Sequence, residues 1–145
     1  MKHTLINKHD AVNFHDARVN GVAFHGNDMV WELVALANPD SRDGGDCYIK
    51  NAVMTLENAA IESVRVDGRP VCDEYDELLT KISYRNFSYI YGTEDLPSAD
   101  DGRYRMGVMA GCEIVVSFTK STIEWDEFAG TDWYRGKSWT NGHPN

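Results

Sequence analysis

The stretch that decides the fold is residues 103–126, which read RYRMGVMAGCEIVVSFTKSTIEWD. Apolar and polar side chains alternate along it, as they do in strands that have one buried face and one wet face. The connections between these runs are short, which favours antiparallel neighbours. The stretch therefore predicts three consecutive strands, with a buried face formed by Tyr104, Met106, Val108, Cys112, Ile114, Val116, Phe118, Ile123 and Trp125.

The earlier part of the chain predicts more strands. Segments 17–25 and 29–36 flank the turn residues Gly26-Asn27-Asp28, which is the pattern of a hairpin. The apolar phase of the first segment changes at Gly21, and this predicts a β-bulge. The second segment is apolar on both faces except at Glu32, which is typical of a central, covered strand. Further strands are expected at 47–56, 60–66 and 82–91, the last from the stripe Phe87, Tyr89 and Tyr91.

One helix is expected near 73–81. Its apolar residues Tyr75, Leu78, Leu79 and Ile82 follow the i, i+3, i+4, i+7 spacing of a single helical face. The sequence thus predicts a mainly β protein, an antiparallel β-sandwich or flattened barrel of about eight strands with this one short helix.

Length and charge narrow the class of protein. A chain of 145 residues corresponds to one domain, and residues 1–11 and 136–145 are expected to be mobile or loosely packed, with His3 and His9 at the surface. The formal net charge of -9 argues against nucleic acid and against anionic membranes. A charged protein partner would accordingly be basic.

The cysteines and the start of the chain predict a cytoplasmic location. Cys47, Cys72 and Cys112 are odd in number and lack metal-binding spacing, so they are expected to be free and mostly buried thiols. The first ten residues contain no apolar run typical of a secretory signal, and no stretch approaches the length of a membrane span.

Catalytic and metal-binding residues are few. His15 and Asp16 could form a general base, but neighbours on an extended chain point in opposite directions, so a structural role at a strand junction is favoured. His15 and His25 lie too far apart along one strand to share an ion, and no zinc, nucleotide or serine-hydrolase motif is present. The sequence therefore predicts no metal and no cofactor, while His15, Asp16 and His25 remain candidate binding residues.

The segment 125–134 concentrates aromatic and acidic side chains. Aromatic residues serve both as core clamps and as contact anchors at interfaces. Burial of Trp125 follows from the strand period, whereas Trp133 and Tyr134 lie beyond Gly130, where that pattern has ended. Two interpretations stay open for Trp133 and Tyr134: they close the core, or they bind a partner.

The ends of the chain carry a resemblance. Phe14-His15-Asp16-Ala17 and the late pattern Trp125-x-Glu127-Phe128-x-Gly130-x-x-Trp133-Tyr134 resemble elements of small uncharacterised bacterial β-rich proteins, some of which are similar to immunity proteins of toxin systems. The resemblance implies a β-rich domain and no catalytic residue.

Three hypotheses follow. The first is a non-catalytic cytoplasmic domain that binds another protein, an immunity-type neutraliser of a basic toxin being one form of it. The second is a small-ligand-binding protein or enzyme with a pocket between the sheets, lined by Trp31, Tyr84, Tyr89, Tyr91 and Tyr104 with His15 or His25 as its polar group. The third is a homodimer formed through a strand edge.

Overall fold

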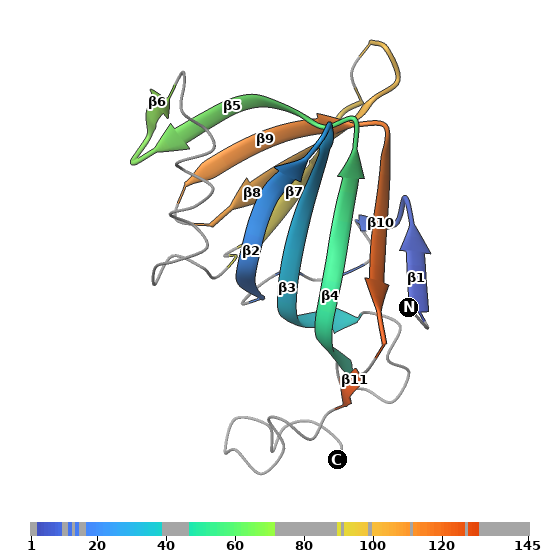
Figure 1. Ribbon diagram of the computed structural model, residues 1–145. Coiled ribbons are helices and arrows are strands. Elements are labelled where there is room, and N and C mark those ends of the chain that lie inside the picture. Colours follow the sequence, from blue (N-terminus) through green and yellow to red (C-terminus); the bar gives the residue numbers. More distant parts are fainter. Residues whose placement is uncertain are drawn as a thin grey trace.

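The computed structural model describes residues 3–9, 12, 14, 17–38, 47–71, 90, 92–98, 100–110, 112–126 and 128–130. The described residues form strands and connections, with no helix among them. The strands, coloured by sequence in Figure 1, are β1 (His3–Ile6), β2 (Arg18–His25), β3 (Asp28–Asn38), β4 (Cys47–Glu57), β5 (Ala60–Val66), β6 (Arg69–Val71), β7 (Gly92–Leu96), β8 (Tyr104–Met109), β9 (Glu113–Phe118), β10 (Lys120–Trp125) and β11 (Phe128–Gly130).

These strands form two antiparallel sheets. The first sheet has the order β1-β10-β4-β3-β2, with β11 also pairing with β4, and the second has the order β6-β5-β9-β8-β7. Figure 1 shows the second sheet behind and beside the first, and in the described part the sheets do not close into a barrel. The predicted antiparallel sandwich is therefore confirmed. The predicted helix near 73–81 and the strand expected at 82–91 lie outside the described residues, apart from Ile90.

A bent two-stranded ribbon joins the sheets. β4 continues into β5 through Asn58 and Ala59, and β9 continues into β10 through Thr119, so both strands pass from one sheet to the other at the same corner (Figure 1). Asn58 has a φ of 49°, in the left-handed region that asparagine tolerates better than most residues. The corner places the outer faces of the two sheets on different sides of the molecule.

Arg103 fastens this corner. Its Nη2 donates to the carbonyl oxygens of Asn58 and of Ser117, the latter at 3.1 Å, and its Nε donates to the Ser117 hydroxyl at 3.3 Å. The backbone N–H of Thr119 also donates to the carbonyl of Glu57 at 2.9 Å. Backbone carbonyls of Asn58, Ser117 and Glu57 at the bend thus all accept hydrogen bonds, as buried or bent backbone requires.

The hairpin of β2 and β3 confirms two predictions and corrects a third. The strands pair around the turn at Gly26, and the register shifts between Val19 and Gly21, where a bulge is predicted. β3 lies inside the sheet, between β2 and β4. It is not fully covered on both sides, because Trp31 and Leu33 are buried while Val30 and Val34 on the other side are only partly buried. The apolar outward residues of β3 therefore face solvent in part.

The core lies between the two sheets. The buried face predicted for 103–126 is confirmed: Trp125 is 3 % exposed and Cys112 8 %, while Tyr104 is half-buried. Burial of these aromatic and aliphatic side chains is the main stabilising contribution to such a sandwich. The large side chains with less than 2 % exposure are Trp31, Phe14, Phe118, Met29, Leu33, Ile49, Met54, Leu56, Ile90 and Met106.

The N-terminal segment differs from its prediction. His3–Ile6 forms β1 and pairs with β10, from His3 opposite Trp125 to Ile6 opposite Thr122. His9 is 5 % exposed, so the expectation that it lies at the surface is wrong. Four residues are too few to reveal a strand by their alternation, and the edge of β10 supplies the hydrogen-bonding partner that the sequence cannot show.

Candidate functional site

The described residues include one of the predicted binding residues. His25 is exposed at the end of β2, in register with Asp28, beside the turn. This register puts it on the solvent side of the first sheet, away from the space between the sheets. The ligand-pocket hypothesis needs a polar group in that space, and His25 does not supply it. His15, Asp16, Trp133 and Tyr134 lie outside the described residues.

Cys112 has the character of a core residue. It is 8 % exposed, and burial raises the pKa of its thiol to about 11. A nucleophilic cysteine needs the opposite, a pKa lowered by positive charge or a helix N-terminus. Within the described residues no group of three histidine, cysteine or acidic side chains is placed to hold a metal ion.

A buried histidine joins the two sheets. His9 Nδ1 lies 2.7 Å from the hydroxyl of Ser121 on β10, and His9 Nε2 lies 3.5 Å from Asp95 Oδ1 on β7. The His9 ring also meets the rings of Phe118 and Tyr104 edge-on, at centroid distances of 5.0 and 5.5 Å. The imidazole therefore contacts the first sheet on one side and three strands of the second sheet on the other.

Asn7 holds this histidine in place. The backbone N–H of Asn7 donates to the Ser121 carbonyl at 2.8 Å, and the Ser121 N–H donates to Asn7 Oδ1 at 2.9 Å. Asn7 has a φ of 55°, so the chain turns there as it leaves β1. The turn directs His9 inward over the end of β10.

Ser121, His9 and Asp95 are the three residue types of a hydrolytic triad. A nucleophile must be reached by its substrate, yet Ser121 is 0 % exposed. In this group it is the carboxylate that faces solvent, since the Asp95 side chain is 48 % exposed. The arrangement suits a polar connection between sheets better than acyl transfer. One feature of the sequence indicated this polar connection. Ser121 is in phase with the inward residues Ile123 and Trp125, and a buried hydroxyl requires a hydrogen-bonding partner.

The solvent side of the first sheet, called here the outer face, has an unusual composition. The strand registers place Ala23, Val30, Thr55, Thr122 and Ile6 side by side on β2, β3, β4, β10 and β1. This set, the uncharged row, spans four strand spacings or about 19 Å. Ala23 and Ile6 are exposed, Ile6 to 51 %, and the other three are partly exposed. Solvent faces of antiparallel sheets usually carry polar or charged residues at such positions.

The next row of the outer face is acidic. It consists of Gly21, Glu32, Val53, Glu124 and Thr4 in direct register. Within the described part of the chain neither Glu32 nor Glu124 has an ion-pair partner. A Cβ atom on Gly21 would lie 3.3 Å from Glu32 Oε2, so the glycine leaves room for the Glu32 side chain over β2.

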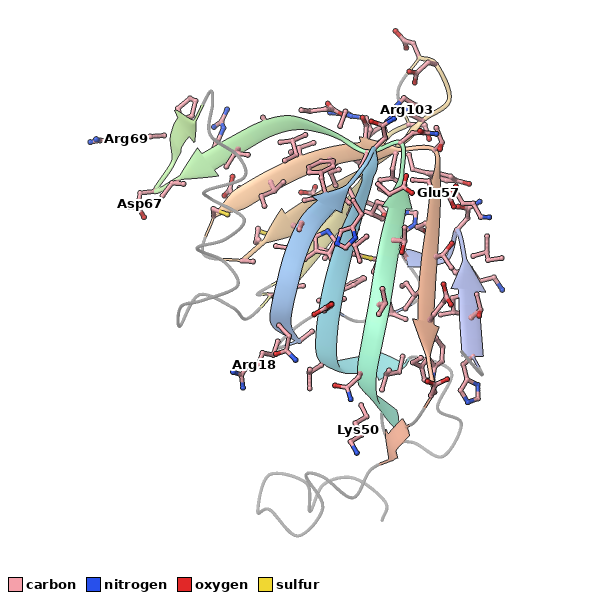
Figure 2. All side chains as sticks on the ribbon, viewed as in Figure 1. Arg18, Lys50, Glu57, Asp67, Arg69 and Arg103 are labelled. Atoms are coloured by element: carbon pink, nitrogen blue, oxygen red, sulfur yellow. The ribbon has the colours of Figure 1, made fainter. Side chains whose placement is uncertain are left out.

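At one end of the outer face the acidic side chains have partners within the chain, and basic side chains lie near the other end, unlike at its centre. Glu57 pairs with Lys120 at 3.7 Å, and Asp28 Oδ1 accepts from the Asn58 N–H at 3.1 Å. Figure 2 shows Glu57 near one end of β4, and Lys50 and Arg18 near the other end of the sheet. The central rows of the outer face thus carry two carboxylates and no base.

The outer face of the second sheet is arranged differently. Arg105 on β8 holds both carboxylate oxygens of Glu62 on β5, with Nε at 2.9 Å from Oε2 and Nη2 at 3.0 Å from Oε1. Ser117 of β9 lies opposite Arg105 on one side and Ala60 on the other, Glu62 lies at the register shift of β5, and Ser117 is 6 % exposed. Hydrogen bonding to Glu62 raises the pKa of Arg105. Arg105 and Glu62 thus neutralise each other, whereas Glu32 and Glu124 on the first sheet, and Glu94 of β7 on this one, have no ion-pair partner within the described residues.

Comparisons with known proteins give no further guide to the site. No protein-family model, no curated protein and no solved structure matches this chain. Among the described residues there is no helix that could cross a membrane.

Proposed function

We propose that this chain is a non-catalytic domain that binds another protein through the outer face of the first sheet. The observation that carries the proposal is the uncharged row, because five solvent-facing positions in register across five strands hold only alanine, valine, threonine and isoleucine. Large apolar patches on a protein surface mark interaction sites, and this row joins the exposed Ile6 and Ala23 through partly exposed valine and threonine side chains without a charge.

The dimensions of the face suit a protein rather than a small molecule. Five strands with a spacing of about 4.8 Å and two to four outward residues each give an area of about 500 Å², which is more than half of one side of a standard interface of about 800 Å². Small and β-branched side chains lose little rotamer freedom when a partner covers them. A flat face of this size offers a protein many contacts and offers a small ligand little enclosure.

Charge points to a basic partner. The chain has a formal net charge of -9, and the two carboxylates in the middle of the outer face are not neutralised within the described residues. Opposite charge on the partner would speed association and make binding strongest at low salt. An immunity-type role, in which this chain neutralises a basic toxin, agrees with these features and with the resemblance carried by residues 14–17 and 125–134. A cytoplasmic location would agree with it as well.

A capture experiment with two matched variants tests the proposal. Thr55→Arg puts a long cation in the centre of the uncharged row, and Val115→Arg does the same on the outer face of the second sheet, where Val115 is partly exposed. The immobilised wild-type chain and the Val115→Arg control should capture the same protein from lysate of the source cells at low salt. Thr55→Arg should lose it. Equal capture by all three chains would contradict the outer face as the binding surface.

One observation favours a second candidate, a ligand site between the sheets. Among the described residues, the indole N–H of Trp31 is buried with no hydrogen-bond acceptor, and Trp31 is 0 % exposed. An unsatisfied buried donor costs about 1–3 kcal/mol, so an acceptor atom supplied by a ligand would stabilise the fold. Native mass spectrometry of the purified protein tests this candidate. A bound small molecule that is absent from Trp31→Phe would support it, and bare protein in both cases would exclude it.

A further inference from the structure

We infer that Glu32 and Glu124 are the two anchor points of the outer face, and that each takes one lysine or arginine side chain of a basic protein partner. This inference rests on the proposed function and adds where the partner's charges must lie. Glu32 is on β3 and Glu124 is on β10, and Val53 of β4 lies between them in register. Two strand spacings, about 10 Å, separate their backbones, and the Glu32 carboxylate lies over β2, on the side away from Glu124.

The surroundings of these two residues distinguish them from the other acids of the sheet. Glu57 already has Lys120 at 3.7 Å, and Asp28 already accepts a backbone hydrogen bond. Glu32 is exposed and Glu124 is partly exposed, and no cation of the described residues reaches either of them. A carboxylate that is partly desolvated at an interface needs a charge partner, because an unpaired buried charge is strongly unfavourable. The partner must therefore supply two cations.

Other occupants fit less well. A second copy would bring four carboxylates of the same kind together, and like charges placed opposite each other cost several kcal/mol. Nucleic acid and anionic membrane surfaces would be repelled in the same way. A single metal ion cannot bridge the two carboxylates, because their backbones are about 10 Å apart, Glu32 leans toward β2, and calcium–oxygen distances are about 2.4 Å.

The uncharged row completes the description of the partner. It lies directly beside the acidic row, so a surface that places cations over Glu32 and Glu124 also covers Val30, Thr55 and Thr122. That part of the partner must be flat and free of charge, since a buried unpaired charge there would oppose binding. The partner surface is therefore an uncharged strip with two cations at least about 10 Å apart along one side.

Photo-crosslinking in cells identifies what covers this face. The photoreactive residue p-benzoylphenylalanine is placed at Thr55 in the full chain, and at Val115 in a matched control chain. We expect an adduct from the Thr55 position with a different protein, whose crosslinked surface carries at least two lysines or arginines. An adduct with a second copy of the chain, or with an acidic surface, would overturn the inference and leave protein binding intact. Absence of any adduct from both positions would overturn the proposed function as well.

Affinity measurements with the crosslinked protein then test the two anchors. Glu32→Gln and Glu124→Gln keep the shape of each side chain and remove its charge. At an ionic strength of about 0.05 M each should weaken binding about tenfold, and each should reduce the salt dependence of the affinity. Glu94→Gln, an exposed site on the outer face of the second sheet, should change affinity less than about twofold. Unchanged affinity in both anchor variants would refute their role while the Thr55 adduct still supported protein binding.

Discussion

His9 Nδ1 lies 2.7 Å from the hydroxyl of Ser121, although 112 positions separate the two residues in the chain. The hydrogen bond brings the segment after β1 to the inner side of β10, and the other ring nitrogen faces Asp95 of the opposite sheet. One imidazole thus connects the first sheet, the second sheet and the N-terminal segment. The stability of the sandwich should depend on it.

Removal of the serine hydroxyl should destabilise the protein. Ser121→Ala leaves the buried His9 Nδ1 without this partner, and an unsatisfied buried polar group costs about 1–3 kcal/mol. Urea unfolding measured by tryptophan fluorescence gives the change in the free energy of unfolding. Ser63→Ala, at an exposed position of β5, is the control and should change it by less than about 0.5 kcal/mol. Equal stabilities of the two variants would show that the His9–Ser121 hydrogen bond contributes nothing.

The corner between the sheets should depend on Arg103. Arg103→Ala removes the donors that reach the Asn58 and Ser117 carbonyls and the Ser117 hydroxyl. Hydrogen bonds from a charged donor contribute about 1.5–3 kcal/mol each, so a loss of about 2–4 kcal/mol is expected. Arg65→Ala, on the exposed side of β5, is the matched control and should have little effect. A variant Arg103→Ala as stable as wild type would show that the bend holds without the guanidinium.

Trp125 should be one of the most costly residues to truncate. It is 3 % exposed and stacks on His3 of β1 with 5.3 Å between ring centroids. Trp125→Ala should lower the free energy of unfolding by about 3–5 kcal/mol, the usual range for a buried aromatic side chain. Trp125→Phe keeps most of the apolar surface and should cost less. A loss below about 1 kcal/mol for the alanine variant would mean that this part of the core is not formed in solution.

Cys112 should be inert in the folded protein and should make stability depend on alkaline pH. Burial raises the pKa of its thiol to about 11, so at pH 8 only about one molecule in a thousand carries the thiolate. In the unfolded chain the thiol ionises near its ordinary pKa of about 8.5. The contribution of the protonated thiol to stability is therefore full below about pH 8.5 and is lost as the pH rises toward 11.

Two measurements check the Cys112 prediction. Alkylation of the native protein at neutral pH should leave Cys112 unmodified, as peptide mapping can show, and labelling should follow unfolding. Denaturation of Cys112→Ser and of wild type across pH 8–11 should show a steeper decline for wild type. Rapid labelling of Cys112 in the native state would contradict the buried, protonated thiol.

Much of the fold could be predicted from sequence, because the alternation of apolar and polar residues along a strand indicates which side chains are buried. The inward faces of β8, β9 and β10, the hairpin of β2 and β3 and the bulge at Gly21 all follow from the spacing of apolar residues and turn residues. β1, β6, β7 and β11 were not predicted. They are three to five residues long, which is too short for a period to emerge, and they exist because a neighbouring strand offers an edge.

The candidate face was visible in the sequence but was interpreted differently. Val30 and Val34 stand in the outward phase of β3, and an apolar outward phase is typical of a strand covered on both sides. Only the structure shows that Val30 is partly exposed and that it lies in a row with Thr55 and Ile6. Pairing of distant segments decides which outward residues become neighbours.

The sequence by itself determined the class of the protein: alternating periods, turn residues and net charge require an acidic antiparallel β domain with Trp125 and Cys112 inside. Local periodicity suffices for this because each strand buries its own apolar side. Only the tertiary structure decided which strands pair, that His9 enters the core to meet Ser121, and that Glu32 and Glu124 flank Val53 on one face. Those relationships depend on strand order and register, which are set by packing between segments far apart in the chain.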